Sequence, residues 1–138
     1  MRHATVLSSF SVMAGILGLS FAAGAAGPAN LPTGIYSSLA ASERSGDFVG
    51  LEIFVLQGAT GHFAVIQGSE GAPGDPITVP LQVNGNAVRF SIPGRCACAL
   101  PEGIYEAQLS QTRATLRGPG TFGERQLPRR NSFWQGGQ

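Results

Sequence analysis

The sequence predicts an all-β fold of about eight short antiparallel strands in a meander, closed as a small barrel or, alternatively, folded as a sandwich. Helical periodicity is nearly absent after residue 30, and glycine and all nine prolines interrupt the chain from residue 27 onward at short intervals. The chain has 138 residues, of which 43% are apolar and 12% charged, as expected for one folded domain with a single core.

The first 26 residues are expected to be a signal peptide. A short basic start precedes an apolar run over residues 6–21, and Ala23 and Ala25 satisfy the small-x-small rule for cleavage. An uncleaved anchor is the alternative, but this run is shorter than the ~20 residues that a membrane-spanning helix needs. We therefore expect a periplasmic or secreted protein whose residues 27–138 form one β-barrel-like domain, without stable membrane insertion after the signal is removed.

The charge balance argues against nucleic acid as a partner. The chain has nine arginines, eight acidic residues and no lysine, so removal of Arg2 with the signal leaves a formally neutral domain. Charge is uneven only near the C-terminus, where Arg125, Arg129 and Arg130 cluster. These arginines either face solvent or meet an anionic partner.

Eight segments after the leader suit strands because each is short, rich in apolar residues and bounded by turn-forming residues. They are residues 34–38, 48–57, 62–69, 77–83, 87–93, 103–110, 113–117 and 124–134.

The hairpin formed by residues 48–66 is apolar on both faces. One face carries Val49, Leu51, Ile53 and Val55, and the other carries Phe48, Phe54, Leu56, Phe63 and Val65. The second face needs cover, which the N-terminal segment or a C-terminal strand with Phe133 and Trp134 would supply. Without such cover, the second face is a contact surface for a protein partner or a small apolar ligand, and its candidate residues are Phe48, Phe54, Phe63 and Trp134.

The next hairpin has the clearest turn signal. Asn84-Gly85 supplies the two positive φ angles of a type I′ turn and would pair Val83 with Asn86. A loop at Gly85-Asn86 would keep the same faces. In either register the inward side chains are apolar, namely Ile77, Val79, Leu81, Val88, Phe90 and Ile92.

Glu52 lies on the otherwise apolar second face of the first hairpin, where an unpaired charge is costly. We expect an arginine partner, with Arg89 and Arg129 as the candidates, because a bidentate arginine pair satisfies a carboxylate best. Glu52 is either one half of such a salt bridge or a catalytic carboxylate with a raised pKa. No second acid is placed to form an acid/base pair with it.

Cys96 and Cys98 are the only cysteines, and their spacing leaves three interpretations open. On a regular strand the two side chains would be too far apart to bond, so a disulfide requires a tight turn, which the flanking prolines allow. Free or intermolecularly paired thiols, and a metal or redox site, are the alternatives.

Three sequence patterns resemble a loose group of small exported bacterial proteins without an assigned activity. The patterns are Gly46-Asp47-x-x-Gly50-x-Glu52-Ile53, Gln67-x-x-Glu70-Gly71-x-Pro73 and Leu127-x-Arg129-x-x-Ser132-x-Trp134. The resemblance implies a compact exported β domain. It also implies a shared role for Glu52, Glu70, Arg129, Ser132 and Trp134. Glu52, Glu70, Arg89 and Arg129 are the candidate polar cluster, either structural or ligand-binding.

No concentrated set of ionisable groups indicates catalysis. We therefore expect a binding or structural domain of the cell envelope rather than an enzyme, with no metal or other cofactor. The alternatives are an envelope hydrolase or thiol exchanger that uses Glu52 or Cys96 and Cys98, and an inhibitor of an envelope hydrolase.

Overall fold

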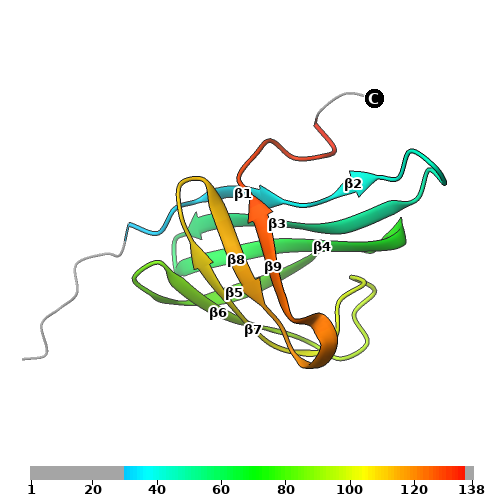
Figure 1. Cartoon of the computed structure of the whole chain (residues 1–138). Coiled ribbons are helices and arrows are strands. Elements are labelled where there is room, and N and C mark those ends of the chain that lie inside the picture. Colours follow the sequence, from blue (N-terminus) through cyan, green and yellow to red (C-terminus); the bar gives the residue numbers. More distant parts are fainter. Residues whose placement is uncertain (1–29, 136–138) are drawn as a thin grey trace, which may run out of the picture.

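The computed structural model describes residues 30–135, which form one antiparallel sheet nearly closed into a barrel (Figure 1). The sheet order is β1-β3-β4-β5-β6-β7-β8-β9, and a short β2 pairs with β3. The strands are β1 (Gly34–Ser37), β2 (Ala40–Ala41), β3 (Phe48–Gly58), β4 (Gly61–Pro73), β5 (Ile77–Asn84), β6 (Ala87–Ile92), β7 (Gly103–Leu109), β8 (Arg113–Arg117) and β9 (Glu124–Pro128). A 3₁₀ turn, η1 (Gly120–Phe122), precedes β9. The predicted all-β meander is confirmed, and the barrel rather than the sandwich describes it.

The barrel closes between β1 and β9 at a single point. An isolated antiparallel bridge joins Tyr36 to Arg129, and the Arg130 N–H donates to the Ile35 carbonyl at 3.1 Å. Alternate residues of a strand direct their N–H groups to the same side. Pro128 is two residues before Arg130, so its nitrogen also faces β1, but proline has no N–H to donate. The ladder therefore stops, and β9 and β2 run apart from each other (Figure 1).

The interior of the barrel is filled by side chains. Tyr105 stacks on Phe90 at 5.4 Å between ring centroids and meets Phe122 edge-on at 5.1 Å. The largest fully buried side chains of the described residues include Tyr36, Tyr105, Leu39, Leu51, Ile66, Ile92, Leu109, Leu116 and Leu127. Most of them belong to one continuous apolar cluster, which holds the strands together by removing apolar surface from water.

The β5–β6 turn uses the second of the two predicted registers. Val83 pairs with Val88 and Asn84 with Ala87, so the two loop residues are Gly85 and Asn86. Gly85 has a φ of 59°, as a type II′ turn requires at its first central position. The predicted Asn84-Gly85 loop is therefore wrong, whereas the predicted inward face is confirmed because both registers share it.

The C-terminal end differs from the predicted strand over residues 124–134. β9 ends at Pro128, and residues 130–134, here called the C-terminal strap, leave the sheet. The short β2 was also not predicted. The predicted leader lies outside the described residues, and within residues 30–135 no helix is long and apolar enough to span a membrane.

Both tyrosines of the chain are buried, and burial raises the pKa of Tyr36 and of Tyr105 above 10, partly opposed by Arg129 and Arg125 respectively. Their hydroxyls donate to the carbonyls of Ser110 (2.8 Å) and Pro101 (2.9 Å).

We expect the free energy of unfolding to fall as the pH rises above 10, because the unfolded chain then releases phenolic protons that the folded chain retains. Urea unfolding between pH 8 and pH 11 checks this, with phenolate absorbance as the direct probe of ionisation. Tyr36→Phe should flatten the fall. Phenolate absorbance that rises in the folded protein at the pH of free tyrosine would contradict the expectation.

Candidate functional site

A row of polar side chains crosses the outer face of the sheet. Ser37 on β1 lies opposite Glu52 on β3, and Glu52 lies opposite Gln67 on β4. Because side chains alternate along a strand, these three residues share the face opposite the core residues Tyr36 and Ile53. Glu52 is only 9% exposed, although it stands on the outside of the barrel.

The C-terminal strap buries Glu52. The Ser132 hydroxyl donates to Glu52 Oε1 at 2.6 Å, and the Phe133 backbone N–H donates to Glu52 Oε2 at 2.9 Å. Both carboxylate oxygens therefore accept a bond from the strap, and hydrogen bonds to a charged acceptor are among the stronger ones in proteins.

The two ends of the strap are fixed by the other members of the polar row. The Arg130 guanidinium donates to the Ser37 hydroxyl at 3.3 Å and to the Leu39 carbonyl. At the far end, the Trp134 indole N–H donates to the Gln67 side-chain oxygen at 2.8 Å. The strap thus crosses β1, β3 and β4 with a polar anchor on each strand.

The predicted arginine partner of Glu52 is wrong. Arg89 lies near Glu106 on the neighbouring strand, at 4.0 Å between Nε and Oε1. Arg129 donates to the Gln111 side chain and to the Thr33 carbonyl, each at 2.6 Å. Strap groups satisfy Glu52 instead, because the chain turns back over the sheet directly after β9.

An aromatic cluster surrounds the end of the strap. Phe48 meets Phe133 at 5.7 Å and Trp134 at 5.5 Å between ring centroids, and Phe133 meets Trp134 at 5.1 Å. The expected cover of the second hairpin face by Phe133 and Trp134 is therefore present at the Phe48 end. Trp134 itself remains 45% exposed.

The other end of the same face is not covered by the strap. Phe54 is 38% exposed and lies opposite Ile35 on β1 and Val65 on β4. Leu56 and Phe63 pair in the next row and are half-buried. We call these five residues, Ile35, Phe54, Leu56, Phe63 and Val65, the outer apolar strip.

Cys96 and Cys98 are joined by a disulfide, with Cα atoms 5.2 Å apart. Arg95 and Ala99, on either side, adopt positive φ angles of 61° and 57°, which supply the tight turn. The Gly68 N–H donates to the Cys98 carbonyl at 3.0 Å, and a Cβ at Gly68 would lie 2.7 Å from that oxygen. The disulfide loop therefore lies directly against β4.

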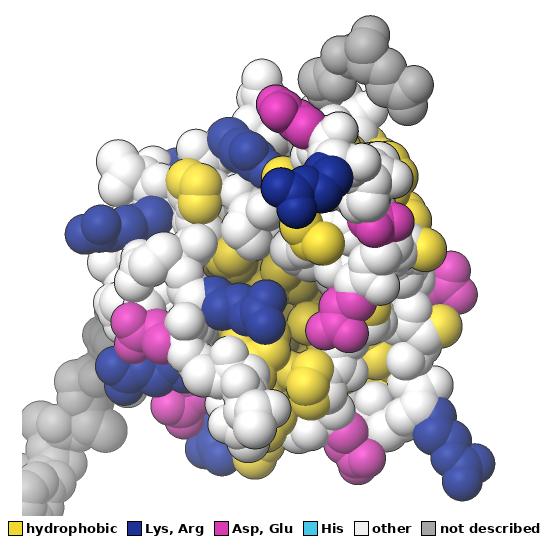
Figure 2. Space-filling model, turned by 45° about the vertical axis from the view of Figure 1, so that its right-hand side comes forward, with side chains coloured by type: hydrophobic (Ala, Val, Ile, Leu, Met, Phe, Trp, Pro, Cys, Tyr) yellow, Lys and Arg dark blue, Asp and Glu magenta, His cyan; other side chains and the backbone are white. Residues whose placement is uncertain are grey.

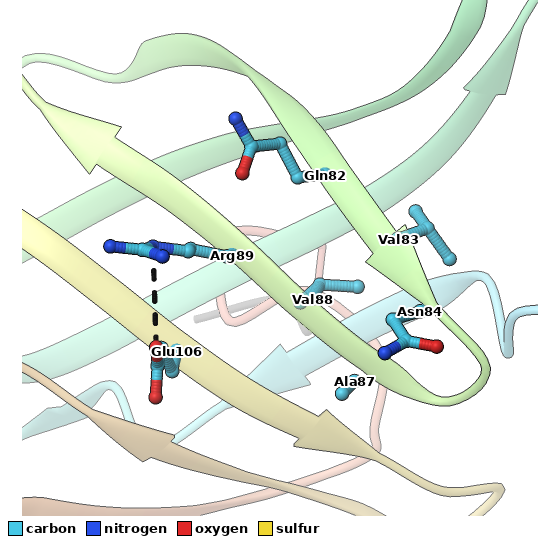
Figure 3. A pocket seen from close by; sticks show the side chains of 7 residues that line it. All are labelled: Gln82, Val83, Asn84, Ala87, Val88, Arg89 and Glu106. Carbon is cyan, nitrogen blue, oxygen red and sulfur yellow. Dashed lines mark ion pairs between the residues drawn. The ribbon is translucent and has the colours of Figure 1, made fainter.

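A groove on the outer wall surrounds the Arg89–Glu106 pair. It has a volume of about 330 Å³ and contains the pair, Gln82 and Asn84 beside the apolar Val83, Ala87 and Val88 (Figure 3). Both charged side chains are more than half exposed, so the pair contributes little to stability.

The structure does not bring the four candidate polar residues into one cluster. Arg89 is in the groove, Arg129 is at the closure of the barrel, Glu52 is under the strap, and Glu70 is exposed at the end of β4. The structure does bring together four residues of the three resembling sequence patterns, namely Glu52 with Ser132 and Gln67 with Trp134. Ser37 and Arg130 complete the row. Ser37 gave no sequence signal, and Arg130 was noted only as part of the basic cluster, because the roles of both residues depend on where the chain turns.

Comparison with models of known protein families, with curated proteins and with solved structures found no significant match. No group of three or more metal-ligating side chains occurs among the described residues.

Ser132→Ala should lower the free energy of unfolding by about 2 kcal/mol, because it removes a donor to a buried charged carboxylate. Trp134 is the only tryptophan, so its fluorescence should shift to the red as the strap loosens. Asn131→Ala, an exposed neighbour, is the matched control. Equal stability and emission in the two variants would show that the Glu52 contact does not hold the strap.

Ser69→Ala should raise stability by about 1 kcal/mol. The Ser69 hydroxyl is buried and has no partner among the described residues, and an unsatisfied buried hydroxyl is costly. Chemical denaturation measures the difference. A loss of stability on substitution would mean that the hydroxyl has a partner, such as a buried water.

Proposed function

We propose that this protein is an exported, non-catalytic binding domain of the cell envelope, which contacts a protein partner through the outer apolar strip. The observation that carries the proposal is the exposure of Phe54 on a face whose other half the chain covers with its own strap. Large exposed apolar side chains that adjoin one another are typical of contact surfaces.

The engagement of Glu52 supports a non-catalytic role. Its two carboxylate oxygens accept hydrogen bonds from the Ser132 hydroxyl and the Phe133 N–H of the strap. The disulfide leaves no free thiol among the described residues. Neither group on which a catalytic function would depend is thus available to a substrate.

The shape of the strip favours a protein over a small apolar ligand. Small ligands bind in concave sites that enclose most of their surface, whereas the strip is one face of a three-stranded sheet. The barrel interior, the other candidate for an apolar ligand, is filled by its core side chains. A broad apolar face with aromatic side chains is typical of the core of a protein interface.

Site-specific photo-crosslinking in the host cell tests this proposal. Thr78 is exposed and lies opposite Val65, so a crosslinker at position 78 borders the strip without replacing any of it. We expect one discrete crosslinked product from position 78 and none from position 113 on β8. The product's mass distinguishes a second copy of the chain from another protein.

Phe54→Ser should abolish this product and weaken the complex re-formed from the two purified proteins at least tenfold. Ile104→Ser is the matched control, because Ile104 is 50% exposed but lies on β7, outside the strip. Equal crosslinking from positions 78 and 113, or equal effects of the two serine variants, would contradict the proposal.

A further inference from the structure

The open end of the barrel contains a small cavity of mixed polarity. It has a volume of about 110 Å³, well above the ~10–15 Å³ that one water molecule needs. Its walls come from β3, β4, the disulfide loop, η1 and β9, and they are formed by Gly50, Ser69, Glu70, Ala99, Leu100, Pro101, Thr121, Phe122 and Arg125. Figure 2 brings this side forward and shows an apolar hollow with arginine and carboxylate side chains around it.

Arg125 is held in place at this cavity. Its guanidinium carbon lies 4.4 Å from the centroid of the Phe122 ring, a cation–π contact that orients the planar group. Phe122 is itself fixed by its edge-on contact with Tyr105. The guanidinium forms no ion pair with any of residues 30–135, so its N–H groups remain available to donate to a ligand.

Glu70 supplies the opposite charge. Arg125 and Glu70 come from β9 and β4, and neither forms an ion pair with any residue in the range 30–135. Ser69 also lines the cavity, although by strand alternation its side chain shares the face of Glu52. The polar side chains that line the cavity are therefore the two charges of opposite sign, Glu70 and Arg125, and the hydroxyl residues Ser69 and Thr121.

We propose that this cavity binds a small zwitterion, namely a free α-amino acid with a small apolar side chain. Its carboxylate would accept hydrogen bonds from Arg125, its ammonium group would lie at Glu70, and its side chain would contact Leu100 and Pro101. A simple anion would be repelled by Glu70 and a simple cation by Arg125. This site is separate from the outer apolar strip and does not depend on the function proposed for it.

Titration of the purified protein with alanine, acetate and ethylammonium, followed by amide NMR, tests the proposal. We expect alanine to shift the resonances of residues 69–70 and 121–125 saturably, with a dissociation constant in the millimolar range or below. Acetate and ethylammonium should each bind at least tenfold more weakly, because each meets one favourable and one unfavourable charge.

Arg125→Gln and Glu70→Gln should each weaken alanine binding at least tenfold. Arg117→Gln is the matched control, because Arg117 is an exposed arginine on the next strand that pairs with Glu124 at 2.7 Å, outside the cavity. Thr121→Val leaves the Arg125–Phe122 contact intact and should weaken alanine binding severalfold. It replaces Arg125→Gln as the test variant if Arg125→Gln alters the fold. Acetate binding as tight as alanine binding, shifts outside the cavity, or no shift with any probe would overturn the proposal.

Discussion

The buried carboxylate of Glu52 determines how the C-terminal part of the chain is arranged. A charge on the outside of a barrel normally stays in water, and covering it is favourable only when its oxygens are satisfied. The strap meets this requirement with one hydroxyl and one backbone N–H. The positions of Phe133 and Trp134, and hence the aromatic cluster with Phe48, depend on these two bonds.

The incomplete closure of the barrel has a related cause. Pro128 cannot extend a ladder toward β1, so the strands part after the Tyr36–Arg129 bridge. Arg130 compensates in part, because its side chain donates to the Leu39 carbonyl next to the closure. The missing donor of Pro128 thus limits the pairing of β9 with β1, and the strap begins at the last shared backbone bond, between Arg130 and Ile35.

The sequence was sufficient for the features that depend on local pattern. Alternation placed the faces of the β5–β6 hairpin correctly even though the turn lies one residue later than first expected. A disulfide was one of three alternatives for Cys96 and Cys98, and it required a tight turn, which the positive φ angles of Arg95 and Ala99 supply. The sequence did not predict the partners of Glu52, because an arginine partner was inferred from charge alone. The actual donors, Ser132 and Phe133, lie 80 and 81 residues away and are uncharged. Such contacts depend on the path of the chain after Pro128, and the pattern of apolar and polar residues does not predict that path.

An apolar side chain at position 52 could also be covered by the strap, so stability alone does not explain a glutamate there. Apolar contacts are non-directional and would allow the strap to slide along the face. A carboxylate that requires two specific donors fixes Ser132 and Phe133 in one register, and the Trp134–Gln67 bond then fixes the next residue. We infer that Glu52 contributes positional specificity. It determines where the strap ends, and therefore how much of the outer face remains exposed beside Phe54.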